Sequence, residues 1–255
     1  MDKHLRILAE EGANGLELSA SMIWDEPTNV SIKELEQFKK KINGYGLAIC
    51  SIHSLTYTRP DLKIFDSSEN RNALINYIVQ MADAASVLGS PHMVFGSAQS
   101  RNYGDRNRKD CYSILVETFQ RIAEKTAKKG VMILIEPLSR IKTDSIVNTD
   151  EGALLVKEVA HDAFGLHIDL KSSFYENEDQ QRIWREYGST IHHCHVSNPG
   201  MQPPSSECLH HDVAADAMRC NQYSGYISIE MGRRYGDTVT NLRNSLNFIK
   251  KKYLS

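Results

Sequence analysis

Hydrophobic and polar positions follow two different patterns along the chain. Longer segments repeat apolar residues three and four positions apart, as a helix face requires, and shorter runs are rich in β-branched and aromatic residues, as strands are. The helical pattern predicts eight helices, over residues 2–12, 31–43, 69–88, 108–129, 150–161, 178–187, 211–222 and 238–253. The short runs predict seven strands, over residues 15–20, 47–55, 92–97, 131–138, 164–170, 191–197 and 225–231.

The regular alternation of strand and helix predicts an α/β fold made of parallel βα units. The chain has 255 residues, the length of one barrel, and no linker divides it, so we expect a single TIM (β/α)8-type barrel domain over residues 1–255. It opens on a helix where a full barrel opens on a strand. The barrel is therefore expected to lack or shorten its first strand, unless a strand is unrecognised, and another segment or subunit would cover the exposed edges.

Composition narrows the classes of function. Lys and Arg total 30 against 32 for Asp and Glu, a net charge of -2, which disfavours nucleic acid as a partner. The five cysteines include no Cys-x-x-Cys pair, so neither a disulfide framework nor a thiolate zinc site is expected. The N-terminal segment is amphipathic and charged, and no apolar run approaches the roughly 20 residues that span a bilayer. We expect a cytoplasmic protein that binds no membrane.

Four metal-binding side chains stand near the ends of successive predicted strands: Glu136, Asp169, His195 and Glu230. The carboxyl ends of parallel barrel strands meet at one mouth, and side-chain alternation allows all four to point inward. Three carboxylates and one imidazole favour Mn²⁺, with Mg²⁺ or Co²⁺ as alternatives, over a structural zinc. The sequence therefore predicts a divalent metal site. For any one of these acids alone, a helix cap or a salt bridge is the simpler interpretation.

Other polar residues occur on the same strands. His167 and His193 fall one inward layer below Asp169 and His195, where a structural or supporting role is expected. His53 ends the second predicted strand, and it is interpreted either as a contact to substrate hydroxyls or as a hydrogen-bonded core residue. Glu17 is similarly placed.

The order Glu, Asp, His, Glu, at spacings of 33, 26 and 35 residues, resembles that of the xylose-isomerase-like TIM-barrel superfamily. Within it the chain is most similar to ketose 3-epimerases, such as the D-tagatose and D-psicose 3-epimerases, and to related sugar phosphate isomerase/epimerase proteins. The similarity lies in the stretches VFGSAQSRN, IEPLSRIKTDSIVNTDEGALLVKEV, CHVSNPG and GYISIEM. The resemblance implies a homodimer or a homotetramer.

The resemblance implies a metal-dependent isomerase or epimerase in which Glu136 and Glu230 are both metal ligands and catalytic proton-transfer groups. A carbonyl held by the metal would be polarised, and an enediolate would form when the adjacent carbon loses its proton. Return of the proton gives epimerisation or aldose–ketose isomerisation, and loss of a β-hydroxyl gives dehydration, the reaction of a lyase. The sequence does not separate these outcomes.

The residues around the expected site depart from the ketose epimerases. Lys142 stands where that family has a sugar-binding glutamate, Ser172 where it has a histidine, and Met201 where an arginine is common, whereas Arg140 is kept. Several cations also follow strand ends on the same rim. A phosphorylated or acidic sugar derivative would explain them, although surface loops also carry such residues for solvation. The predicted substrate-binding residues are Arg140, Lys142, His53, Arg101, Lys171 and His211.

Two other functions are considered besides an isomerase or epimerase that acts on a small sugar. An endonuclease IV-type nuclease would need three metals and additional histidines, and it is disfavoured by Ser172 and by the near-neutral charge. A non-catalytic or partner-dependent sugar-binding barrel is suggested by the missing strand, because such a barrel would need another subunit to complete its pocket.

Overall fold

The computed structural model describes residues 1–255. Its seven strands are β1 (Gly15–Ser19), β2 (Ala48–His53), β3 (His92–Phe95), β4 (Met132–Ile135), β5 (Phe164–Asp169), β6 (Ile191–Val196) and β7 (Tyr226–Ile229). Its α-helices are α1 (Asp2–Glu10), α2 (Ile32–Asn43), α3 (Ser68–Leu88), α4 (Ala98–Arg101), α5 (Arg108–Ala127), α6 (Thr149–Val159), α7 (Leu170–Tyr175), α8 (Gln180–Tyr187), α9 (His210–Cys220) and α10 (Thr238–Tyr253).

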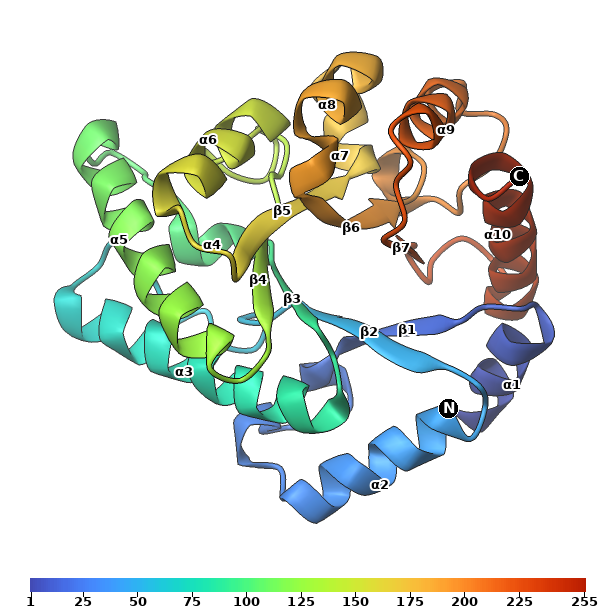
Figure 1. Cartoon of the computed structure of the whole chain (residues 1–255), viewed down its shortest axis with the longest axis horizontal. Coiled ribbons are helices and arrows are strands. Elements are labelled where there is room, and N and C mark those ends of the chain that lie inside the picture. The colour runs from blue at the N-terminus through green and yellow to red at the C-terminus, as the bar shows by residue number, and fades with distance from the viewer.

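The strands form one parallel sheet in the order β1-β2-β3-β4-β5-β6-β7, each beside its neighbour in sequence. Figure 1 shows this sheet curled into a nearly closed barrel with the long helices arranged around its outside. The predicted α/β, TIM-barrel-type fold with seven strands is thus confirmed. Because every connection returns to the same end of the sheet, all strands end at one mouth.

All seven predicted strands and all eight predicted helices are present, with ends that differ by a few residues. Capping side chains account for several helix starts, since an oxygen of Ser31, Ser67, Asn107 or Asn148 accepts a hydrogen bond from a first-turn amide. The sequence pattern missed α4 and α7, which have only four and six residues and are too short to show a helical period. None of the helices combines the length and the apolar character that crossing a membrane requires.

The core lies between the sheet and the helices. One continuous cluster of 50 buried apolar residues reaches from Leu5 in α1 to Tyr253 in α10. Aromatic rings connect the two layers, because Phe119 of α5 packs at 5.1 Å from Phe95 of β3 and at 5.0 Å from Phe164 of β5, between ring centroids. This apolar packing surrounds the barrel and leaves its interior to other side chains.

The seam between β1 and β7 has no strand ladder, and side chains and helices bring its two sides together. Gly15 of β1 lies directly against the ring of Tyr226 on β7. Outside the barrel, α1 and α10 are neighbours (Figure 1), and Arg243 of α10 forms ion pairs with Glu10 and Glu11. The edges expected to need cover are therefore held together within this chain.

Replacement of Gly15 by alanine should destabilise this seam. A methyl group there would lie 2.7 and 2.9 Å from ring carbons of Tyr226 and 3.2 Å from the sulfur of Cys50, so the ring must move. We expect a loss of about 1–3 kcal/mol in the free energy of unfolding, measured by urea denaturation. Gly188→Ala is the control, because its methyl group would make only ordinary contacts, at 3.6 Å or more. Equal stability of both variants would contradict this account of the seam.

Candidate metal centre

The four predicted ligands all lie at the carboxyl ends of their strands. Asp169 is the last residue of β5 and is paired in register with His195 of β6. Glu136 and Glu230 directly follow β4 and β7. Their backbone amides donate to carbonyls of the neighbouring strands, Glu136 to Phe95 of β3 and Glu230 to Val196 of β6, each at 3.2 Å. The strand pattern therefore extends one residue further and places both carboxylates at the mouth.

Three of the four side chains converge on one point. His195 Nδ1 lies 3.5 Å from Glu136 Oε1 and 3.7 Å from Glu230 Oε2, and donor atoms of all three residues lie within 4.8 Å of one another. The ring of His195 is fully buried, yet its Nδ1 has no hydrogen-bond partner. A buried imidazole nitrogen facing two carboxylates is a donor set that fits a divalent metal ion.

Glu17 of β1 orients His195 from below. Its Oε2 lies 2.7 Å from His195 Nε2, and this bond requires a proton on Nε2, so when the ring gives up its second proton the lone pair of Nδ1 faces the mouth. A carboxylate behind a ligating histidine fixes the tautomer and the ring orientation and raises the basicity of the ligand. Glu17 was singled out in the sequence as a possible substrate contact, but the structure places it beneath the site.

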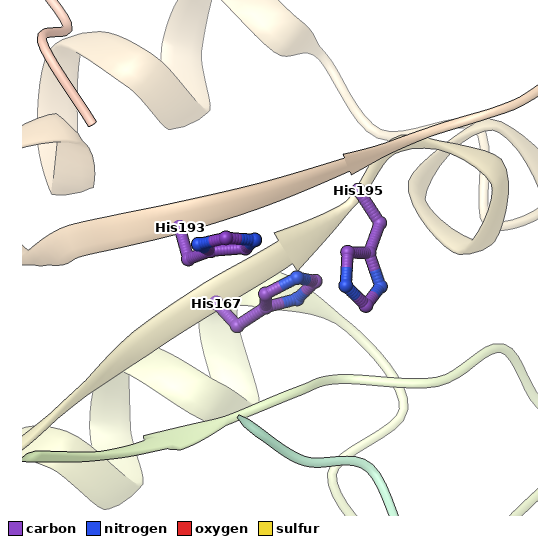
Figure 2. A group of neighbouring side chains, drawn as sticks. All are labelled: His167, His193 and His195. Carbon is purple, nitrogen blue, oxygen red and sulfur yellow. The ribbon is translucent and has the colours of Figure 1, made fainter. Parts of the chain in front are cut away.

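A layer of imidazoles fills the barrel beneath the mouth (Figure 2). His167 of β5 stacks on His193 of β6 with 5.6 Å between ring centroids, and it meets His195 edge-on at 4.1 Å. Burial holds the pKa of His167 well below its ordinary value, so this ring is neutral. The two rings pack directly against His195 and support its position in the barrel.

Buried charges of opposite sign stabilise each other in the pair formed by Glu17 and His195. Burial opposes both charges, but the carboxylates of Glu17 and Glu230 hold the pKa of His195 well above its ordinary value. Burial acts to raise the carboxyl pKa of Glu17, but His195 and His193 have the larger effect and hold that pKa well below its usual range. Glu17 is therefore an anion behind the site.

The two glutamates at the mouth differ from each other. Burial raises the pKa of Glu136, and the negative charges of Glu230 and Asp169 act in the same direction. Glu230 is only partly buried, and although desolvation acts to raise its pKa, His195 and Lys171 lower it below the usual value. The mouth thus combines one carboxyl that holds a proton more readily with one that stays ionised.

Gly96, directly after β3, is a site residue that the sequence analysis did not single out. Its missing side chain makes room for Glu136, because a methyl group at Gly96 would overlap the carboxylate. Glycine is required here for close approach of backbone and side chain. The only signal in the sequence was its place in the VFGSAQSRN stretch.

Two of the six predicted substrate-binding residues lie at the metal centre. His53, at the end of β2, places Nδ1 3.7 Å from Glu230 Oε1 and is partly exposed at the mouth. Lys171, in the first turn of α7, places its ammonium 3.3 Å from Glu230 Oε2 and 2.9 Å from Asp169 Oδ2. Their predicted contact with substrate stays a prediction.

The structure does not bring the other four predicted residues to this centre. Arg140 is 68% exposed and pairs with Glu176, and Lys142 is exposed on the same loop. Arg101 is fully buried, and its guanidinium donates to backbone carbonyls, including that of Glu136 at 2.8 Å. It therefore positions the end of β4, a role that its place after a strand end does not reveal.

His211 is also enclosed away from the mouth. Its Nε2 donates to Asn198 Oδ1 at 2.8 Å, and its Nδ1 accepts from the hydroxyl of Tyr253 in α10. Both ring nitrogens are satisfied in the neutral form, and the side chain is buried. His211 ties the loop after β6 to the last helix and has no free atom for a substrate.

Comparison with known proteins agrees with the barrel fold. The family described as xylose isomerase-like TIM barrel has a sequence model that matches residues 5–252. The chain belongs to this family. No curated protein matches its sequence.

Three solved structures show how far the likeness extends. D-psicose 3-epimerase from Clostridium cellulolyticum H10, solved with D-tagatose, superposes with a TM-score of 0.84 at 18% identity, over 98% of this chain and 93% of that one. The 3-keto-D-glucoside 4-epimerase YcjR from E. coli gives 0.83 at 18% identity, over 97% and 92%. AP endonuclease, family 2, from Brucella melitensis gives 0.71 at 18% identity, over 94% and 90%. At this identity the superpositions establish the fold.

His211 should make the protein sensitive to acid. Burial lowers its pKa to about 4, below the ordinary value of 6.5, so its contribution to stability is complete above pH 6.5 and is lost as pH falls toward 4. At pH 5 the loss amounts to about 2 kcal/mol. His211→Gln keeps one donor and one acceptor but cannot titrate. Between pH 7.5 and 5 the free energy of unfolding should therefore fall by about 2 kcal/mol less in this variant than in the wild type. Parallel losses in urea denaturation would contradict this role.

Proposed function

We propose that this protein is a divalent-metal-dependent isomerase or epimerase of a sugar or sugar derivative. The observation that carries the proposal is the placement of Glu136 and Glu230, which flank the free Nδ1 of His195 from β4 and β7. Two strands lie between them, so the carboxylates approach the mouth from different sides. In this arrangement one carboxylate can remove a proton from one face of a substrate carbon atom, and the other can return a proton to the opposite face.

The residues that would hold the metal are Glu136, His195, Glu230 and, as the fourth ligand, Asp169. Carboxylate oxygens with one imidazole suit Mn²⁺ best, with Mg²⁺ or Co²⁺ as alternatives. When bound, the ion would polarise a substrate carbonyl and stabilise the negative charge that develops when a neighbouring carbon loses its proton. Glu17 keeps His195 oriented for this role through the 2.7 Å hydrogen bond to Nε2.

Proton transfer falls to the two glutamates. The lowered pKa of Glu230 keeps a carboxylate ready to accept a proton, and the raised pKa of Glu136 favours a carboxyl that can return one. Acid–base pairs of this kind arise when two environments push the pKa values of similar groups apart. Epimerisation, isomerisation and dehydration all begin with the same proton removal and stay open.

The substrate class is proposed from the sugar epimerases that share the fold and from the cations near the mouth. Lys171 lies at the centre, and Arg140 and Lys142 lie exposed on the loop after β4, so a phosphorylated or acidic sugar derivative fits. A homodimer or homotetramer, a cytoplasmic location and a single domain over residues 1–255 belong to the same proposal.

The proposed reaction class differs from that of the endonuclease that shares the fold. Ser172 Oγ donates to Asp169 Oδ2 at 2.8 Å and lies where a three-metal site would need a further histidine. The net charge of -2 gives no general attraction to DNA. Three zinc ions per purified chain would favour the nuclease instead.

Exchange of substrate hydrogen with solvent tests the proposal, because epimerisation, isomerisation and dehydration all begin with the same proton removal. Purified protein with Mn²⁺ is incubated in D₂O with free ketoses, sugar phosphates and sugar acids, and proton NMR follows deuterium at the carbon beside the carbonyl. We expect metal-dependent deuterium incorporation that EDTA removes. Absence of exchange in every class of sugar would overturn the proposal.

Substitution of either proton-transfer glutamate should stop exchange without unfolding the barrel. Glu230→Gln and Glu136→Gln each keep the shape of the side chain but remove the basic oxygen. Positioned general acids and bases contribute about 100- to 10,000-fold, so each variant should lose at least about 100-fold in rate. Glu117→Gln, on the exposed surface of α5, is the control. Turnover retained by Glu230→Gln would refute its role.

Glu17→Gln should weaken the metal site although Glu17 is not a ligand. The amide still accepts a hydrogen bond from His195 Nε2 but no longer adds negative charge behind the ring. Loss of such a supporting carboxylate costs about 10- to 100-fold in metal affinity. Calorimetric titration with Mn²⁺ measures the change, and Glu117→Gln again serves as the control. Unchanged affinity would show that the charge of Glu17 does not act on the site.

A further inference from the structure

Lys171 lies inside the proposed metal centre rather than on its rim. Its ammonium contacts Asp169 Oδ2 at 2.9 Å and Glu230 Oε2 at 3.3 Å, so it joins carboxylates from β5 and β7. The side chain is only 12% exposed. A buried ammonium at hydrogen-bond distance from two carboxylates is a strong, charge-assisted interaction.

The carboxylate of Asp169 is already committed to neighbours in α7. Its Oδ1 accepts from the backbone amide of Lys171 at 3.1 Å, which caps this short helix. Its Oδ2 accepts both from the Lys171 ammonium and from Ser172 Oγ, the latter at 2.8 Å. Asp169 accordingly lies outside the group of three side chains, Glu136, His195 and Glu230, that converge on one point.

The same two carboxylates would be needed by a divalent ion. Asp169 Oδ2 and Glu230 Oε2 both face the ammonium, and a dication bound between them would stand next to a like charge. Repulsion at such short range is severe in a poorly solvated site. Ammonium and metal therefore compete for these oxygens.

We propose that Lys171 is an internal cation that competes with the divalent metal for Asp169 and Glu230. Metal binding then requires the ammonium to leave both carboxylates, and the site binds metal more weakly than its four ligands alone would. This inference rests on the proposed metal site, and it adds a residue of this chain that sets the affinity of that site.

Removal of the ammonium tests the competition directly. Binding of Mn²⁺ is followed by electron paramagnetic resonance of the free ion in wild type, in Lys171→Met and in Lys157→Met. Methionine keeps the length of the side chain and loses its charge. Lys157 is exposed on α6, so its substitution makes the same change in net charge far from the competing contacts. We expect Lys171→Met to bind Mn²⁺ at least about tenfold more tightly than wild type, and Lys157→Met to match wild type.

The possible results separate this inference from the function on which it rests. Tight binding by Lys171→Met alone, with none by wild type, would support the inference in its strongest form and would refute metal dependence of the wild type. Equal or weaker binding by Lys171→Met would overturn the competition and leave the metal site standing. Absence of binding in both proteins would overturn the metal site and the inference together.

A measurement on the wild-type protein covers the case in which Lys171→Met does not fold. Acetylation of lysines by a water-soluble reagent is read by mass spectrometry with and without Mn²⁺. Displacement by the metal should free the ammonium, so acetylation of Lys171 should rise several-fold when Mn²⁺ is added, whereas that of Lys157 should not change. Labelling of Lys171 that is unchanged or reduced by the metal would overturn the proposal.

Discussion

Negative charge concentrated at one end of the barrel is the constraint on which the rest of the site depends. Glu17, Glu136, Asp169 and Glu230 all lie around His195, and the first three have little contact with water, whereas Glu230 is partly exposed. Carboxylates in such surroundings must be paired with cations, hold a proton, or accept several hydrogen bonds. Each of these solutions is found here, and together they explain the chemistry that the mouth offers.

The cations that balance this charge come from different parts of the fold. His195 lies between Glu17 and the two mouth glutamates, so one imidazole stabilises an anion on each side of its ring. Lys171 joins Asp169 to Glu230 from the first turn of α7. Glu136 shares His195 with Glu230 but has no contact with Lys171, and burial raises its pKa. The contrast between the two glutamates is thus a result of where positive charge is available.

Closure of the barrel and orientation of the His195 ring depend on the same contact. Glu17 is on the first strand and His195 on the sixth, and their hydrogen bond reaches across the seam beside β7. The ladder of backbone hydrogen bonds stops at β1 and β7, so side chains complete the ring of strands. Fixing the tautomer of His195 is therefore coupled to the integrity of the seam.

The sequence by itself determined the βα alternation and the presence of Glu136, Asp169, His195 and Glu230 at strand ends, because periodicity and position at a strand end are local properties of the chain. It did not reveal α7, whose six residues hold Lys171 against Asp169, nor the burial of Arg101 and His211. Those roles depend on atoms far apart in sequence, such as the carbonyl of Glu136 that Arg101 binds. A side chain's charge can be read from its identity, but its contacts form only when the strands pack together. Tertiary structure alone therefore decided which cation faces which carboxylate.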